Sequence, residues 1–112
     1  MFQRVAANFE KYLNVLSVRQ KAVASNIANG DTPGYQTSDV NFQSEFQNAL
    51  NGQAAQTQPV ENLLSKPDGN NVDLDREARM LAETAIRFQM VTQLARGEIR
   101  SIRSAIQDGR QA

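Results

Sequence analysis

The sequence predicts an all-α protein in which two long helices, one at each end of the chain, form an antiparallel coiled-coil hairpin. Apolar side chains recur at alternating three- and four-residue steps over both ends, which is the spacing of a coiled-coil seam. The segment between them, residues 30–72, is polar and rich in Gly, Pro, Asn and Gln, so we expect it to be partly disordered. A chain of 112 residues is long enough for a single domain, residues 1–112.

The N-terminal helix is expected over residues 1–29, where the chain contains neither Gly nor Pro. Arg19 and Asn26 continue the apolar seam with polar side chains. An ordinary amphipathic helix is the alternative interpretation, but the length and the regular spacing favour a coiled-coil or bundle helix. The apolar side chains expected to pack in this seam are Phe2, Val5, Phe9, Tyr12, Leu16 and Val23.

A turn motif follows this helix. Gly30 is expected to end the helix by entering the left-handed region, and Pro33-Gly34 suits the central positions of a type II turn. Tyr35 is then placed to fold back on the helix. Asn side chains near a helix end can bond the following loop, or here a neighbouring chain. The residues of the turn motif, which we expect to act in assembly, are Asn26, Ile27, Asn29, Gly30, Thr32, Pro33, Gly34 and Tyr35.

The polar middle gives weaker signals. Residues 36–42 alternate in a way that suits a short extended piece, whereas residues 41–51 suit a short helix that Asn51-Gly52 would stop. Residues 51–71 contain few apolar side chains, so we expect them to be mobile on their own.

The C-terminal helix is expected over residues 73–108, with Asp73 as its N-cap. Further apolar side chains, among them Met90 and Leu94, lie off its main stripe. One partner helix cannot cover both sets, which indicates self-assembly or lateral packing. The side chains of the main stripe that we expect to pack are Leu81, Ala85, Phe88, Ile99, Ile102 and Ile106.

The composition argues against catalysis and against most ligands. The chain has no Cys and no His, so it has no thiol chemistry and lacks the commonest general base and metal ligand. The segment that contains Asp68, Asp73 and Asp75 lacks the bidentate Glu that ends a calcium-binding loop. These carboxylates therefore suit turns and helix caps instead. Twelve basic and 12 acidic residues cancel, and no basic cluster predicts nucleic-acid binding. We expect no catalytic residue, cofactor, metal or small-molecule substrate.

No apolar run approaches the roughly 20 residues that span a bilayer. The N-terminal residues also lack the uninterrupted apolar core of a signal peptide, because Asn8, Glu10 and Lys11 interrupt them. If the protein leaves the cytoplasm, we expect a route that cleaves no classical signal.

The turn motif resembles the signature of a known family. Residues 25–35 read Ser-Asn-Ile-Ala-Asn-Gly-Asp-Thr-Pro-Gly-Tyr, which closely resembles the motif of the flagellar axial proteins, the rod, hook and hook-associated subunits. Leu16 and Arg19 match the middle of that family's N-terminal helix. Gly30 and Gln36 depart mildly from it, since Ala and Lys are common there.

Two further stretches resemble the proximal rod members of this family. Asp39, Val40 and Phe42 are similar to the continuation after the turn, and residues 66–77 are similar to the start of the C-terminal helix. The resemblance covers nearly the whole chain, with residues 43–65 the least diagnostic.

The resemblance implies a structural subunit of the flagellar basal-body rod that forms homo- and hetero-oligomers. It implies as partners the other rod subunits, a FliE-type adaptor, the MS ring and the flagellar export apparatus. It also implies a periplasmic location in the rod after export without a cleaved signal peptide. The alternative is a cytoplasmic coiled-coil regulator or export chaperone.

Overall fold

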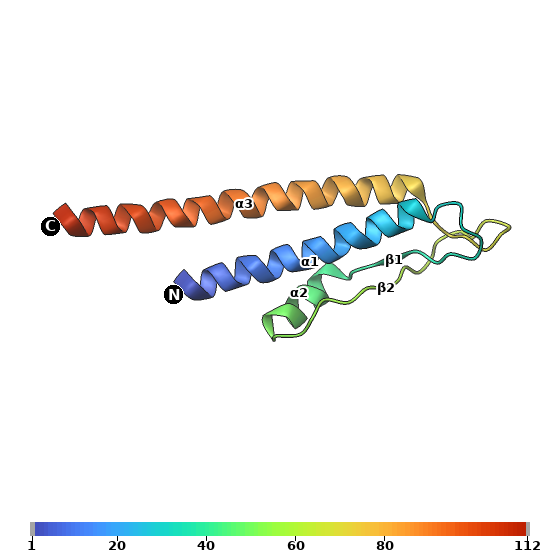
Figure 1. The fold of residues 1–112 in the computed structure, drawn as a ribbon, viewed down its shortest axis with the longest axis horizontal. Coiled ribbons are helices and arrows are strands. Elements are labelled where there is room, and N and C mark those ends of the chain that lie inside the picture. Colours follow the sequence, from blue (N-terminus) through green and yellow to red (C-terminus); the bar gives the residue numbers. More distant parts are fainter. Residues whose placement is uncertain (1, 112) are drawn as a thin grey trace.

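Two long helices lie side by side and run in opposite directions (Figure 1). They are α1 (Phe2–Ala28) and α3 (Leu74–Gln111), so the expected antiparallel hairpin is confirmed. The computed structural model describes residues 2–111, and of their side chains those of residues 3–110. The side chain of Phe2, expected in the seam, lies outside this part.

The molecule is elongated, measuring 72 × 25 × 19 Å. Because α3 has 38 residues and α1 has 27, the C-terminal end of α3 extends past the start of α1 (Figure 1). At 1.5 Å per residue, the difference in length is about 16 Å. The last turns of α3 therefore have no intrachain partner helix alongside them.

The middle of the chain forms short elements beside α1. Strand β1 (Ser38–Asp39) pairs antiparallel with β2 (Gln58–Pro59), and helix α2 (Phe42–Leu50) lies between them in sequence. Both interpretations of this region are realised in succession, because an extended piece precedes a short helix. Asn41 caps α2 by accepting a bond from the backbone N of Ser44, and Asn51-Gly52 follows its end as expected.

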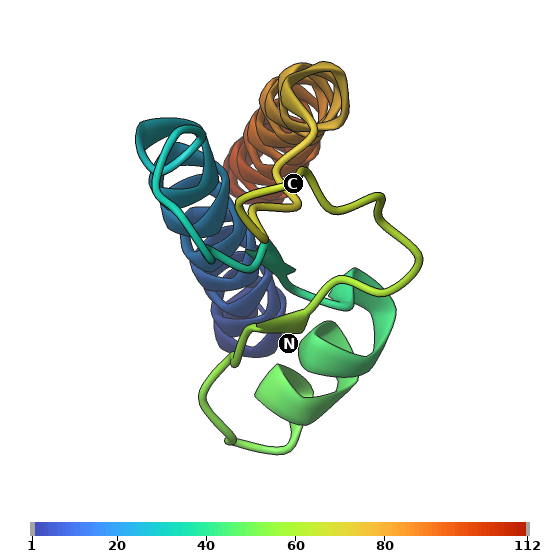
Figure 2. The same cartoon turned by 90° about the vertical axis from the view of Figure 1, so that its right-hand side faces the viewer.

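Helix α2 packs on α1, so that α1, α2 and α3 occupy the corners of a triangle when the molecule is viewed along its length (Figure 2). Val15 of α1 joins Val40 and Ala49 in a buried apolar cluster. Tyr12 lies edge-on to Phe42, with their ring centroids 4.9 Å apart. These contacts hold the middle segment on one side of α1. The side of α1 that faces away from α2 is left without cover by this segment.

The seam of α1 is the expected one. Leu16 and Val23 are fully buried, and Arg19 and Asn26 continue the buried stripe with polar side chains. Val5, Phe9 and Tyr12 are half-buried, toward the free end of the hairpin.

The seam of α3 differs from the expected one. Glu77, Thr84 and Val91, seven residues apart, are buried, whereas the expected Leu81, Ile99 and Ile106 are 46%, 42% and 54% exposed. Ala85 is also exposed, and Phe88 and Ile102 are half-buried on the stripe that the two seams share. The buried seam of α3 is thus displaced by one stripe from the expected seam. Neighbouring stripes of a seven-residue repeat are roughly 50° apart around the helix axis, so α3 is rotated by about that angle.

The reason for this rotation is electrostatic. The sequence pattern places the most apolar stripe of a helix toward its partner. Here α1 and β1 bring Arg19 and Asp39 to α3, and these charges interact with Glu83 and Arg76. The polar stripe of α3 therefore faces α1 near the closed end, and an apolar stripe remains uncovered.

Candidate assembly site at the closed end of the hairpin

The first helix ends where the sequence indicates, but Gly30 ends it in a different way. Positive φ angles among the described glycines occur at Gly34, Gly52 and Gly69, so the expected left-handed conformation of Gly30 is wrong. Instead, the backbone N of Gly30 donates to the carbonyl of Ile27 at 3.2 Å. This tighter bond closes the last turn, as commonly happens at helix ends.

Pro33-Gly34 forms the expected type II turn. The backbone N of Tyr35 donates to the carbonyl of Thr32 at 3.2 Å, and Gly34 has a φ of 75°. The backbone N of Gly34 also donates to the carbonyl of Asp68 at 2.9 Å. The turn thus contacts the second loop, which leads into α3.

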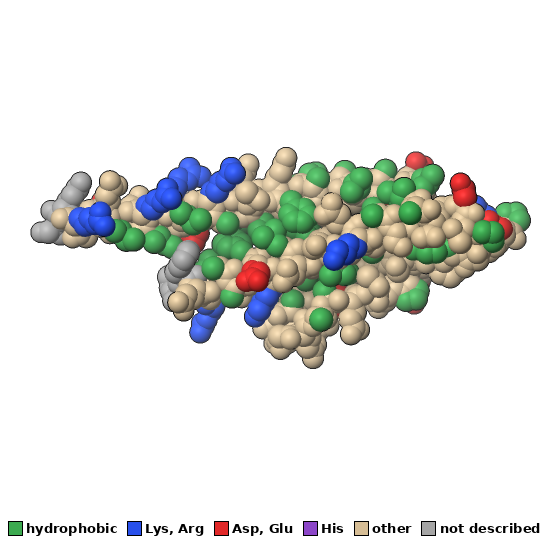
Figure 3. All heavy atoms as spheres, in the orientation of Figure 1, with side chains coloured by type: hydrophobic (Ala, Val, Ile, Leu, Met, Phe, Trp, Pro, Cys, Tyr) green, Lys and Arg blue, Asp and Glu red, His purple; other side chains and the backbone are tan. Residues whose placement is uncertain are grey.

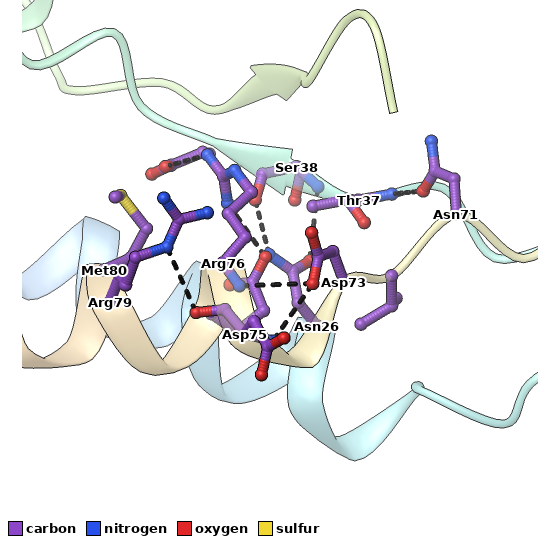
Figure 4. A network of polar contacts seen from close by, with 12 residues as sticks. Asn26, Thr37, Ser38, Asn71, Asp73, Asp75, Arg76, Arg79 and Met80 are labelled. Atoms are coloured by element: carbon purple, nitrogen blue, oxygen red, sulfur yellow. Dashed lines mark hydrogen bonds and ion pairs between the residues drawn. The ribbon is translucent and has the colours of Figure 1, made fainter. Parts of the chain in front are cut away.

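Asn26 is the centre of the first loop's hydrogen bonds (Figure 4). Its side chain is fully buried, and its Nδ2 donates to the carbonyl of Ser38 at 2.8 Å. Its Oδ1 accepts from the backbone N of Ser38 at 3.2 Å and from the Tyr35 hydroxyl at 3.1 Å. One side chain of α1 therefore fixes both the start of β1 and the aromatic ring that folds back on the helix.

Removing the hydroxyl of Tyr35 tests how much the hydrogen bond between Tyr35 and Asn26 contributes to stability. Tyr35→Phe deletes the bond to Asn26 and a 3.0 Å contact with Ser25 Oγ. We expect a loss of about 1 kcal/mol in the free energy of unfolding, measured by urea denaturation followed by circular dichroism. No loss would show that Tyr35 acts only through its ring.

The side chains of Asn29 and Thr32 bond each other rather than a distant segment. Asn29 Nδ2 donates to the Ser25 carbonyl at 2.9 Å, and its Oδ1 accepts from the Thr32 hydroxyl at 3.0 Å. Ile27 and Pro33 are exposed. All eight residues of the expected turn motif therefore lie at this end of the hairpin, but only Asn26 among them is fully buried.

The second loop adds two asparagines that the sequence analysis did not single out. Asn70 is fully buried, and its Nδ2 donates to the carbonyls of Asn29 and Thr32 at 2.9 and 2.8 Å. Asn71 accepts from the backbone N of Thr37 at 2.7 Å. The signal that could have found them is their position as paired amides directly after the turn at residues 66–69, which a 2.9 Å bond from the backbone N of Gly69 to the carbonyl of Lys66 closes.

Asn70→Ala is expected to loosen the contact between the two loops. It leaves two carbonyls without their donor and removes the bond that Asn70 Oδ1 accepts from the backbone N of Val72 at 2.8 Å. We expect a loss of about 1–3 kcal/mol in the free energy of unfolding. The matched control is Asn48→Ala, since no hydrogen bond of the Asn48 side chain occurs in the described part of the chain. Equal losses in the two variants would contradict this role of Asn70.

Charged side chains continue the network toward the middle of the hairpin. Asp39, at the end of β1, is 5% exposed and accepts from Arg19 Nε of α1 at 3.1 Å. Its second carboxylate oxygen accepts from Arg76 Nη2 of α3 at 2.6 Å. Asp39 is thus a buried carboxylate that connects α1, β1 and α3. The sequence analysis used Asp39, and Arg76 within residues 66–77, only for the family resemblance.

Arg76 and Arg87 remain charged within this network. Burial lowers the pKa of Arg76, but its hydrogen bonds and charge attraction with Asp39 and Glu77 raise that pKa overall above its usual value. The hydrogen bond that Arg87 donates to the Tyr12 hydroxyl raises the pKa of Arg87 most, burial opposes this, and the hydrogen bond and charge of Glu83 raise the pKa further. The guanidinium of Arg87 also lies 4.5 Å from the centre of the Phe42 ring.

Two sets of contacts therefore define the closed end, which we call the hairpin-end network. The asparagines Asn26, Asn70 and Asn71 join the two loops, and Asp39 joins both long helices through Arg19 and Arg76. The network can fix how α1 and α3 lie against each other. Its contacts join the two loops and the two long helices of one chain, which is a structural role.

The comparisons agree with this structural role. Residues 13–36, which include the end of α1 and the type II turn, match the family described as "Flagella basal body rod protein". The chain is 32% identical to the flagellar basal body rod protein FlgB of Escherichia coli, over 89% of this chain and 91% of that protein. It is similar to the FlgB proteins of Borrelia hermsii (31% identity; 86% and 90% covered) and Bacillus subtilis (26%; 98% of each).

The fold, the turn and these relatives together define a structural protein of the flagellar axial class. Within that class, the chain belongs to the family of flagellar basal body rod proteins FlgB. It is therefore a structural subunit of the proximal rod of the bacterial flagellum. This membership favours the rod interpretation over that of a cytoplasmic regulator or export chaperone.

Proposed function

We propose that the hairpin is the unit that assembles into the rod. The hairpin-end network fixes α1 against α3 within one chain, and the uncovered apolar stripe of α3 contacts other rod subunits. The observation that carries this proposal is the exposure of Ile99 and Ile106, which share one stripe of α3, and of Leu81 on the neighbouring stripe. A folded helix that leaves such a stripe in water gains free energy when a partner covers it.

The proposed partners follow from the family. We propose that the protein contacts other rod subunits, a FliE-type adaptor and the MS ring, and that it passes through the flagellar export apparatus. We further propose that it resides in the periplasmic part of the rod and keeps its N-terminal residues. Among the helices of residues 2–111, none contains an apolar stretch of the length that a bilayer crossing requires. The protein acts by assembly alone, a proposal supported by the lack of His and Cys in the sequence.

Fractionation tests this function directly. Basal bodies purified from cells that make the protein should contain it, and its intact mass should correspond to the chain without N-terminal cleavage. Recovery only in the soluble fraction would overturn the role in the rod. A mass that lacks the N-terminal residues would overturn the proposed export route while leaving the rod role in place.

A further inference from the structure

The hairpin carries apolar surface on both flanks of α3. On the side away from α2, hydrophobic side chains gather along the line between α1 and α3 (Figure 3). A groove of about 280 Å³ lies there, lined among others by Ala6, Leu13 and Ile99. We call this surface the front face, and it includes the exposed stripe that the expected seam would have buried.

The second apolar surface lies on the side of α2. A groove of about 290 Å³ is lined there by Tyr12, Phe46, Met90 and Leu94, and an adjoining hollow shares Tyr12 and Met90 and adds Ile86. Ile86, Met90 and Leu94 are exposed. We call this surface the rear face. A ridge that contains Gln89 and Arg96, seven residues apart, separates the two faces on the outside of α3.

The charges of the two faces are complementary. Glu10 and Glu98 line the front groove, and neither takes part in an ion pair among the residues that the structure describes. Arg79 lines the rear hollow, and Arg100 shares the stripe of Arg79 and Ile86 by seven-residue spacing. Glu83 and Arg87 also line the rear hollow, but they pair with each other at 2.9 Å. The front groove is therefore apolar with acidic groups, and the rear hollow is apolar with a net basic charge.

We propose that these faces bind each other in neighbouring copies of this chain, the front face of one copy lying against the rear face of the next with the hairpins pointing the same way. A contact between two different faces repeats from copy to copy, whereas a contact of one face with itself stops at a dimer. This mode covers both apolar flanks of α3 with one kind of contact and places carboxylates opposite guanidinium groups. The inference rests on the proposed function and names the surfaces through which copies meet.

Cross-linking tests the proposal cleanly because the chain contains no Cys. Thr92→Cys labels the front face, since Thr92 lies seven residues from both Ala85 and Ile99. Met90→Cys labels the rear face, and Gln89→Cys on the ridge is the matched control. The three variants are produced as full chains in flagellated cells, singly and in pairs, and purified basal bodies are treated with a short bismaleimide.

We expect the front and rear variants, when present together, to form cross-linked dimers several-fold more than either variant alone or than any pairing with Gln89→Cys. Glu98→Arg should lower that yield about two- to fivefold, the size expected for an exposed ion pair, and adding Arg100→Glu should restore it. Front-to-front dimers, or adducts only with a different rod protein, would overturn the proposal. If the variants enter basal bodies but give no such dimers, the inference fails and the proposed function stands; if they never enter basal bodies, both fail.

Discussion

Replacing Asp39 with asparagine is expected to lower the free energy of unfolding by about 3–5 kcal/mol, because removing one partner of a buried ion pair leaves the other charge uncompensated. In this protein the carboxylate has two such partners, Arg19 at 3.1 Å and Arg76 at 2.6 Å. Both guanidinium groups are largely buried. The measurement is urea denaturation followed by circular dichroism.

Two variants separate the buried ion pairs from a general charge effect. Asp31→Asn makes the same change of charge at an exposed position of the first loop and is expected to change stability by less than about 0.5 kcal/mol. Asp39→Glu keeps the charge and should retain part of the stability. A loss below about 1 kcal/mol in Asp39→Asn, the value of an exposed pair, would contradict the role given to this carboxylate.

Asn26→Ala is expected to cost about 3 kcal/mol, because it leaves the part-buried backbone N and carbonyl of Ser38 without their side-chain partner. It also removes one of the two contacts of the Tyr35 hydroxyl, which keeps the one with Ser25 Oγ. Asn14→Ala is the matched control, since Asn14 is an exposed residue of the same helix. Adding Asn29→Ala should cost less than about 1 kcal/mol more, because the bonds of that side chain are local and exposed.

In cells, the double variant Asn26→Ala/Asn29→Ala should impair rod assembly and swimming with little loss of export. The reason is that the substitutions weaken the closed end of the hairpin and leave unchanged the opposite end, where the two chain termini lie. Swimming in soft agar and the amount of protein in purified basal bodies are the measurements. Normal swimming would remove the special role of the turn motif.

The sequence predicted the parts of the fold that depend on local pattern. The seam of α1, the end of that helix before Gly30, the type II turn at Pro33-Gly34 and the cap at Asp73 all follow from neighbouring residues. Asp73 accepts from the backbone N of Asp75 at 3.1 Å, as a cap should. At its C-terminal end, α3 continues to Gln111, three residues beyond the helix end that was expected at residue 108.

The parts that the sequence did not predict depend on contacts between distant residues. Asp39 and Arg76 lie 37 positions apart, and Asn70 and Asn29 lie 41 apart. No periodicity links such pairs, so the hairpin-end network becomes visible only when the fold is known. The rotated seam of α3 has the same origin, because charges supplied by α1 and β1 decide which stripe faces inward. Periodicity alone turns the most apolar stripe inward, because it takes no account of charges on other elements.

The central claim is that α1 and α3 of one chain pack against each other in the rod and that Asp39 holds them together. An electron cryo-microscopy map of the proximal rod in isolated basal bodies tests it most directly. The expected density shows the Asp39 carboxylate within hydrogen-bond distance of Arg19 and Arg76 of the same subunit. Density in which α1 and α3 of one chain are apart, each paired only with helices of other chains, would contradict the claim.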